Sequence, residues 1–134
     1  MEIAICTIDK WAKKVQYSGA KMDLYWVQNG ECKTTQADNY PIGGEQREAK
    51  REFSLNEMDI TLPTTLYMSS YGYKDQFGGV NDKRFMSKNF RNLLFSLVDL
   101  PMEVQGEYLD QTITEWMGYK HKQIDDILVV GVSG

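Results

Sequence analysis

The sequence predicts an α+β fold in which an antiparallel β-sheet or sandwich is flanked by helices. The first half of the chain holds short β-type segments separated by turn signals, and the second half holds two stretches in which apolar residues recur at helical spacing. The chain then closes with a short apolar run typical of a strand. No internal repeat, linker or low-complexity tract interrupts the 134 residues, so we expect residues 1–134 to form a single domain.

The β-type segments are separated by residues that favour tight turns. Residues 1–8 alternate between apolar and polar side chains, Asp9 predicts a turn, and residues 15–18 begin the partner strand. Asn29 and Gly30 tolerate the positive φ angles of a type I′ turn, so they predict a hairpin. The other β-type segments are residues 24–27, 32–36, 53–62 and 65–69, with a charged stretch at 45–50.

Two amphipathic helices are expected after residue 86. Ser87 fits the N-cap of the first helix, Pro101 suits the first turn of the second, and Gly118 marks its end. We expect the final strand at residues 126–132. The first apolar stripe is formed by Phe90, Leu93, Leu94, Leu97 and Val98, and the second by Val104, Tyr108, Leu109, Thr112, Ile113 and Trp116.

Composition excludes some classes of function. The net charge is −4 and no run of Lys or Arg is long enough to suggest a phosphate-binding surface, so we expect no nucleic-acid partner. No apolar run is long enough to span a bilayer. Cys6 and Cys32 are expected to be reduced, buried thiols of a cytoplasmic protein, with a disulfide or metal pair as the alternative. His121 is expected to be a polar loop residue.

Two segments far apart in the sequence each join a strand to a polar, acid-bearing loop. These are residues 66–79 and 123–132. Loops mounted on a rigid sheet often carry carboxylates that bind metal ions, which makes Asp75, Asp125 and Asp126 candidates. The alternatives are that Asp75 and its neighbours shape the loop, and that Asp125 and Asp126 form a solvated loop before a strand.

The aromatic residues of the first segment are open to two interpretations. Tyr71, Tyr73 and Phe77 form either a recognition surface or a set that packs beneath the glycine loop.

Taken in order, five segments resemble blocks of the PPM-type, metal-dependent serine/threonine phosphatases, in the C-terminal half of the SpoIIE-branch domain. The resemblance implies a sandwich of two antiparallel sheets with flanking helices. It also implies two manganese or magnesium ions that activate a water for attack on phosphoserine or phosphothreonine. The five segments are residues 1–9, 17–30, 37–43, 66–79 and 125–126.

The resemblance places the candidate site residues one by one. Asp125 falls where the family has a metal-binding Asp, and Tyr71 falls where the family's Ser-Asp-Gly motif has another. The remaining ligands belong to an N-terminal half that this chain lacks. A neutral phenol is a poor ligand for a hard cation, so Tyr71 implies a degenerate metal position, and no catalytic residue is assigned. The site-adjacent residues are Ser70, Gly72, Asp75 and Asp126.

Three functions fit these features. The first is a degenerate or partial phosphatase module in bacterial signalling that does not hydrolyse phosphate esters on its own. The second is part of an active phosphatase completed by a missing N-terminal half, and the third is a structural or assembly module. The expected partner is a signalling protein or phosphoprotein. An unpaired sheet edge further predicts a homodimer or a complex with a covering partner.

Overall fold

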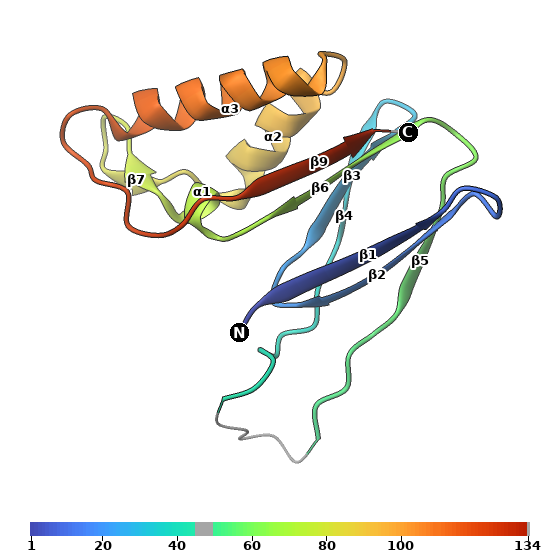
Figure 1. Ribbon diagram of the computed structural model, residues 1–134. Helices are drawn as coiled ribbons and strands as arrows, with labels where there is room; N and C mark the ends of the chain where they lie inside the picture. Colours follow the sequence, from blue (N-terminus) through green and yellow to red (C-terminus); the bar gives the residue numbers. More distant parts are fainter. Residues whose placement is uncertain (45–49, 134) are drawn as a thin grey trace. The chain divides into compact units, whose positions relative to one another are not determined.

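The computed structural model describes residues 1–44 and 50–133, so most of the charged stretch at 45–50 lies outside it. By its internal contacts the chain divides into two compact units, each described by itself below. The first unit comprises Met1–Met68 with Val132–Gly134, and the second comprises Ser69–Gly131. The fold is α+β with antiparallel sheets and helices, as the sequence predicts (Figure 1).

Two sheets contain most of the strands. The three-stranded sheet has the order β1-β2-β5, in which β2 pairs antiparallel with both neighbours. The four-stranded sheet has the order β4-β3-β6-β9, and β3 pairs antiparallel with β4 and β6. The strands are β1 (Ile3–Asp9), β2 (Lys14–Ala20), β3 (Leu24–Gln28), β4 (Glu31–Thr35), β5 (Asn56–Asp59), β6 (Thr64–Ser69) and β9 (Val129–Ser133).

The predicted hairpin between β3 and β4 is confirmed. Asn29 and Gly30 have φ angles of 52° and 73°, the left-handed values that a type I′ turn requires at both central positions. Strand pairing there runs from Gln28 opposite Glu31 outward along both strands. This local signal therefore fixes the register of one edge of the four-stranded sheet.

The core of the first unit lies between inward-facing residues of both sheets. Val15, Tyr17 and Leu24 are fully buried, and they pack with Met58 and Leu66. The hydroxyl of Tyr17 donates a hydrogen bond to the carbonyl of Met22, so burial leaves no unsatisfied phenol.

The second unit is built around buried aromatic rings. The ring centroid of Tyr73 lies 5.0 Å from that of Phe90 and 5.4 Å from that of Phe85, which in turn lies 5.4 Å from that of Trp116. These contacts join the short first helix to both longer helices. The elements are α1 (Gly72–Asp75), β7 (Phe77–Gly78), β8 (Lys83–Arg84), α2 (Ser87–Leu97) and α3 (Met102–Met117).

Four sequence-based predictions of element boundaries and faces are corrected. Ser87 is the first residue of α2 and not its N-cap, because Met86 occupies the cap with a φ of 79° and no side-chain bond. The last strand begins at Val129 and not at residue 126. Within the segment 53–62, only Asn56–Asp59 is a strand. On α3, Tyr108 is exposed, whereas Gln105 is buried and donates to the Leu100 carbonyl at 2.8 Å.

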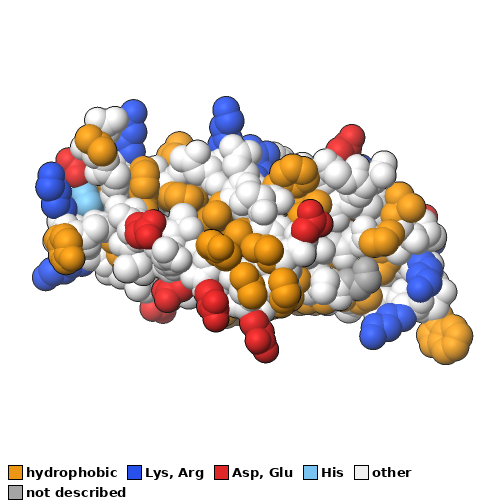
Figure 2. All heavy atoms as spheres, turned by 90° about the horizontal axis from the view of Figure 1, so that it is seen from above, with side chains coloured by type: hydrophobic (Ala, Val, Ile, Leu, Met, Phe, Trp, Pro, Cys, Tyr) orange, Lys and Arg blue, Asp and Glu red, His pale blue; other side chains and the backbone are white. Residues whose placement is uncertain are grey.

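No helix in the described ranges has both the length and the apolar character needed to cross a bilayer. The face of the chain in Figure 2 mixes apolar side chains with acidic ones.

Candidate functional site

The loop that follows β6 is bound to the segment that precedes β9. The Ser70 backbone N–H donates to the Leu128 carbonyl at 2.9 Å. The Ser70 hydroxyl accepts the Leu128 N–H at 2.9 Å and donates to the Asp126 carbonyl at 2.9 Å. The two acid-bearing segments identified in the sequence therefore meet, although more than fifty residues separate them.

Gly72 shows how closely these segments approach. A Cβ atom built on Gly72 would lie 2.1 Å from the carbonyl oxygen of Asp126, which no real side chain allows. The glycine is thus required for a close backbone approach and not for a positive φ. Tyr71 stands between Ser70 and Gly72, so its backbone belongs to the part of the loop that meets the Asp126 carbonyl.

Tyr71 occupies the position before the first turn of α1, with φ −71° and ψ −18°. Its carbonyl accepts the N–H of Asp75 at 3.0 Å, so the backbone of Asp75 helps to shape the loop. The Lys74 ammonium lies 4.3 Å from the centroid of the Tyr71 ring, a cation–π distance, and Lys74 is only 7% exposed. The ring therefore already has a positive charge beside it.

The two aspartates before β9 are both exposed. A carboxylate oxygen of Asp125 accepts the Asp126 N–H at 2.7 Å, and the Gln123 side-chain amide donates to the Asp125 carbonyl at 3.0 Å. These bonds hold a turn just before the strand. That Asp125 occupies a metal-binding position remains a prediction.

Gln76 organises the site and was missed by the sequence analysis. Its side chain is completely buried, donates to the Lys122 carbonyl at 2.9 Å and accepts the Ile124 N–H at 3.4 Å. Its backbone carbonyl accepts the Trp116 indole N–H at 2.9 Å. A buried amide with these contacts fastens the closing segment to the loop. No local pattern predicts this role, because Gln76 follows two other polar residues, Lys74 and Asp75.

Tyr73 packs inside the second unit. Its hydroxyl donates to the Leu109 carbonyl at 2.7 Å. Burial raises the pKa of the Tyr73 hydroxyl, and the nearby negative charge of Asp110 raises it further. Of the two interpretations of the aromatic residues, packing therefore describes Tyr73.

The donor set does not fit the manganese or magnesium pair that the family resemblance implies. Across residues 1–44 and 50–133, no three His, Cys, Asp or Glu side chains gather closely enough to hold a metal ion. Two exposed aspartates and a phenol are fewer hard oxygen donors than two such ions require.

Neither a protein-family model nor a curated protein sequence matches the chain. Solved structures do match it. The SiaA-PP2C domain of Pseudomonas aeruginosa superposes with a TM-score of 0.88 at 25% identity, over 99% of this chain and 51% of that chain. The phosphatase domain of the cell fate determinant SpoIIE from Bacillus subtilis superposes with a TM-score of 0.72 at 12% identity, over 98% of this chain and 57% of that chain. A manganese-presoaked structure of that domain gives a TM-score of 0.71 at 15% identity, over 99% and 56% of the two chains.

The likeness to the SpoIIE phosphatase domain, at 12% and 15% sequence identity, shows the fold alone. The chain spans about half of the length of the solved domains that it matches.

Proposed function

Since the chain has the fold of the C-terminal half of a PPM-type, SpoIIE-like phosphatase domain, we propose that it is a degenerate phosphatase module. It acts in the cytoplasm of a bacterium, binds a signalling protein or phosphoprotein, and does not hydrolyse phosphate esters on its own. The proposal is supported by Tyr71, a phenol at the position where the family resemblance implies an acid, between Ser70 and Gly72, whose contacts reach the Asp126 carbonyl.

The chemistry of residue 71 supports the loss of hydrolysis. A phenol is neutral at physiological pH, whereas a hard divalent cation prefers charged carboxylate oxygens. The Lys74 ammonium beside the ring adds positive charge where the family resemblance implies metal ions. Both changes lower the affinity for a divalent cation, and the water that such ions activate is lost with them.

The contacts around residue 71 support a retained binding role. Ser70, Gly72 and Gln76 still hold the two acid-bearing segments together through backbone and side-chain contacts. A scaffold that keeps this end ordered can present a binding surface to a phosphoprotein without turning it over.

Hydrolysis of p-nitrophenyl phosphate and of a phosphoserine peptide with manganese tests the proposal. We expect no turnover by the unmodified chain above that of manganese alone. Robust turnover that disappears in Asp125→Ala would refute the proposal.

Metal binding gives a second measurement that does not depend on activity. In calorimetry with manganese alone, Tyr71→Asp should bind at least about tenfold more tightly than the unmodified chain, because a carboxylate replaces the phenol. Tyr71→Phe is the matched control and should bind no more tightly than the unmodified chain. Equal affinities for Tyr71→Asp and Tyr71→Phe would show that residue 71 is not a metal position.

A second function is favoured by the length of the match. The chain covers 51% of the SiaA-PP2C domain, so it is also a candidate for one part of an active phosphatase. Mixing it with the separately produced N-terminal half of that domain tests this. Manganese-dependent hydrolysis that requires both parts and is lost in Asp125→Ala would replace the degenerate-module proposal.

A further inference from the structure

β1 is an edge strand that has a partner on one side only. Its residues pair with β2, from Ile3 opposite Ala20 to Asp9 opposite Lys14, and the sheet order β1-β2-β5 leaves its other side without a strand among the described residues. A row of backbone N–H and C=O groups along seven residues is a template for another strand.

We propose that β1 pairs antiparallel with β1 of a second copy of this chain, with Cys6 opposite Cys6 on a two-fold axis. The two three-stranded sheets then form one continuous sheet across the dimer. In this register Ala4 lies opposite Ile8, and Ile5 lies opposite Thr7. The proposal concerns assembly and does not rest on the phosphatase-like function.

Charge complementarity favours this register. With Cys6 on the axis, Glu2 of each copy, just before β1, comes near Lys10 of the other, the first residue of the turn after β1, so two pairs of opposite charge flank the paired strands. Both residues are exposed and free to meet across the interface. A shift of register by two residues places Glu2 opposite Ile8 or opposite Ala12 and removes both attractions.

The inner face of β1 is also complementary to itself. Ala4 and Cys6 pack against the core of the first unit, whereas Ile8 is 40% exposed. Ile8 lines an open cavity of about 380 Å³ together with Ile60 and Val132, all within the first unit. Pairing the large Ile8 with the small Ala4 of the second copy covers the isoleucine without a clash.

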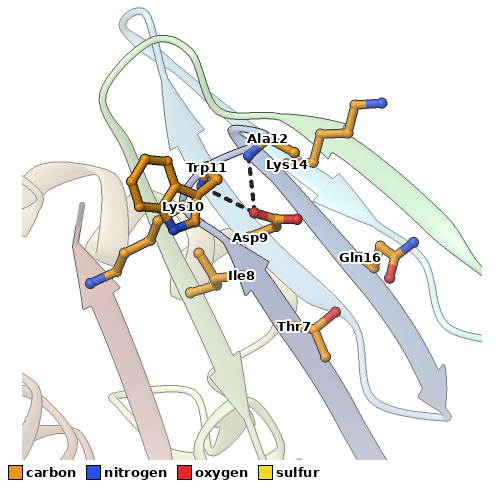
Figure 3. Close-up of a pocket in the computed structure, with 8 residues that line it drawn as sticks. All are labelled: Thr7, Ile8, Asp9, Lys10, Trp11, Ala12, Lys14 and Gln16. Atoms are coloured by element: carbon orange, nitrogen blue, oxygen red, sulfur yellow. Dashed lines mark hydrogen bonds between the residues drawn. The ribbon is translucent and has the colours of Figure 1, made fainter.

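The hairpin tip adds an apolar contact. Figure 3 shows the turn after β1, in which a carboxylate oxygen of Asp9 accepts the N–H groups of Trp11 and Ala12 at 3.0 and 2.9 Å. Trp11 is 98% exposed and Met1 is 72% exposed. The Met1 backbone is held by Ile42, and in the proposed dimer the exposed Met1 side chain of one copy faces the turn that carries Trp11 of the other, where a thioether–aromatic contact is favourable.

The other edge strands are less suited to pair with themselves. β4, β5 and β9 have five, four and five residues, against seven in β1. Full self-pairing of β4 places Lys33 opposite Lys33, which repels, and β5 carries two acids and no base. β9 has no charged residue to select a register.

A charge-swap cycle tests the pairing, with any purification tag at the C-terminus. Sedimentation should show a dimer of the unmodified chain at micromolar concentration. Glu2→Lys and Lys10→Glu should each raise the dimer dissociation constant about tenfold, because each turns two attractions into repulsions. The double variant should return to within about threefold of the unmodified chain. A monomer at these concentrations, or a double variant no better than the single ones, overturns the proposal.

The two cysteines provide a matched pair for cross-linking. Directly opposite residues of antiparallel strands have Cα atoms within disulfide range. Cys32→Ser keeps Cys6 and should give a covalent dimer with mild oxidant or a short bismaleimide, whereas Cys6→Ser keeps Cys32 and should not. A dimer that cross-links only through Cys32 overturns the assignment to β1.

Discussion

Replacement of Gly72 by alanine measures how tightly the two acid-bearing segments are joined. The new Cβ would meet the Asp126 carbonyl oxygen at 2.1 Å, so one backbone segment must move by about 1 Å to reach ordinary contact. Asp126 is held by the Ser70 hydroxyl, which also accepts the Leu128 N–H, so the movement stretches both bonds. Overpacking costs about 1–3 kcal/mol and the weakened bonds about 1 kcal/mol, which together lower the free energy of unfolding by about 3 kcal/mol.

Gly106 is a matched control within α3. A Cβ built there meets nothing within 4 Å, and the residue lies inside a helix. Gly106→Ala should therefore raise the free energy of unfolding by about 0.5–1 kcal/mol, since alanine has the higher helix propensity. Urea titration followed by the fluorescence of the three tryptophans gives both values from one assay.

The two glycine variants must move in opposite directions. If Gly72→Ala costs less than about 0.5 kcal/mol while Gly106→Ala stabilises as expected, the close approach between residues 72 and 126 is wrong. The weakening of the Ser70 hydrogen bonds that we expect in Gly72→Ala would then have no structural basis. A Gly106→Ala variant that destabilises would show that the open space beside α3 is filled in solution.

Three further predictions concern the polar groups of the second unit. Ser70→Ala should lower the free energy of unfolding by about 1–2 kcal/mol in urea titration, because two hydroxyl hydrogen bonds are lost. Gln76→Leu should cost about 2–4 kcal/mol and speed amide exchange at residues 122–124, since the Lys122 carbonyl loses its buried donor. The raised pKa of Tyr73 means that the folded state keeps a proton that the unfolded state loses above the ordinary value of 10.0. Stability should therefore be full below that pH and fall as the pH rises above it, and Tyr73→Phe should flatten this fall in thermal melts.

Each of these predictions has an outcome that contradicts it. Unchanged stability of Ser70→Ala would mean that water replaces the hydroxyl at no cost. Slow exchange at residues 122–124 in Gln76→Leu would show that the closing segment is held by other contacts. An identical alkaline slope in Tyr73→Phe would assign that slope to other titrating groups.

The sequence predicts those features that local chemistry determines. Asn29 and Gly30 predict the hairpin because few other residue pairs adopt two successive positive φ angles. The fold class and the likeness to half of a SpoIIE-type domain are also confirmed. The order of five short segments carried that likeness, since each segment alone is too common to be informative.

Features set by distant contacts escape such reasoning. Met86 occupies the N-cap of α2, and its N–H donates a hydrogen bond to the Lys74 carbonyl at 2.7 Å. No local sequence pattern predicts this contact. The last strand starts late because the backbone from Asp126 to Leu128 is already bonded to Ser70. The need for glycine at position 72 arises likewise from a carbonyl more than fifty residues away.

Tyr71 is flanked by Ser70 and Gly72, whose contacts with Asp126 hold this loop in place. Ser70 and Gly72 hold the backbone through groups that do not depend on the intervening side chain. The phenol can therefore be exchanged for an unnatural amino acid, such as a bipyridyl chelator or a solvatochromic dye. Such a probe, if its aromatic ring keeps the contact with the Lys74 ammonium, would report on cations and partners at this loop.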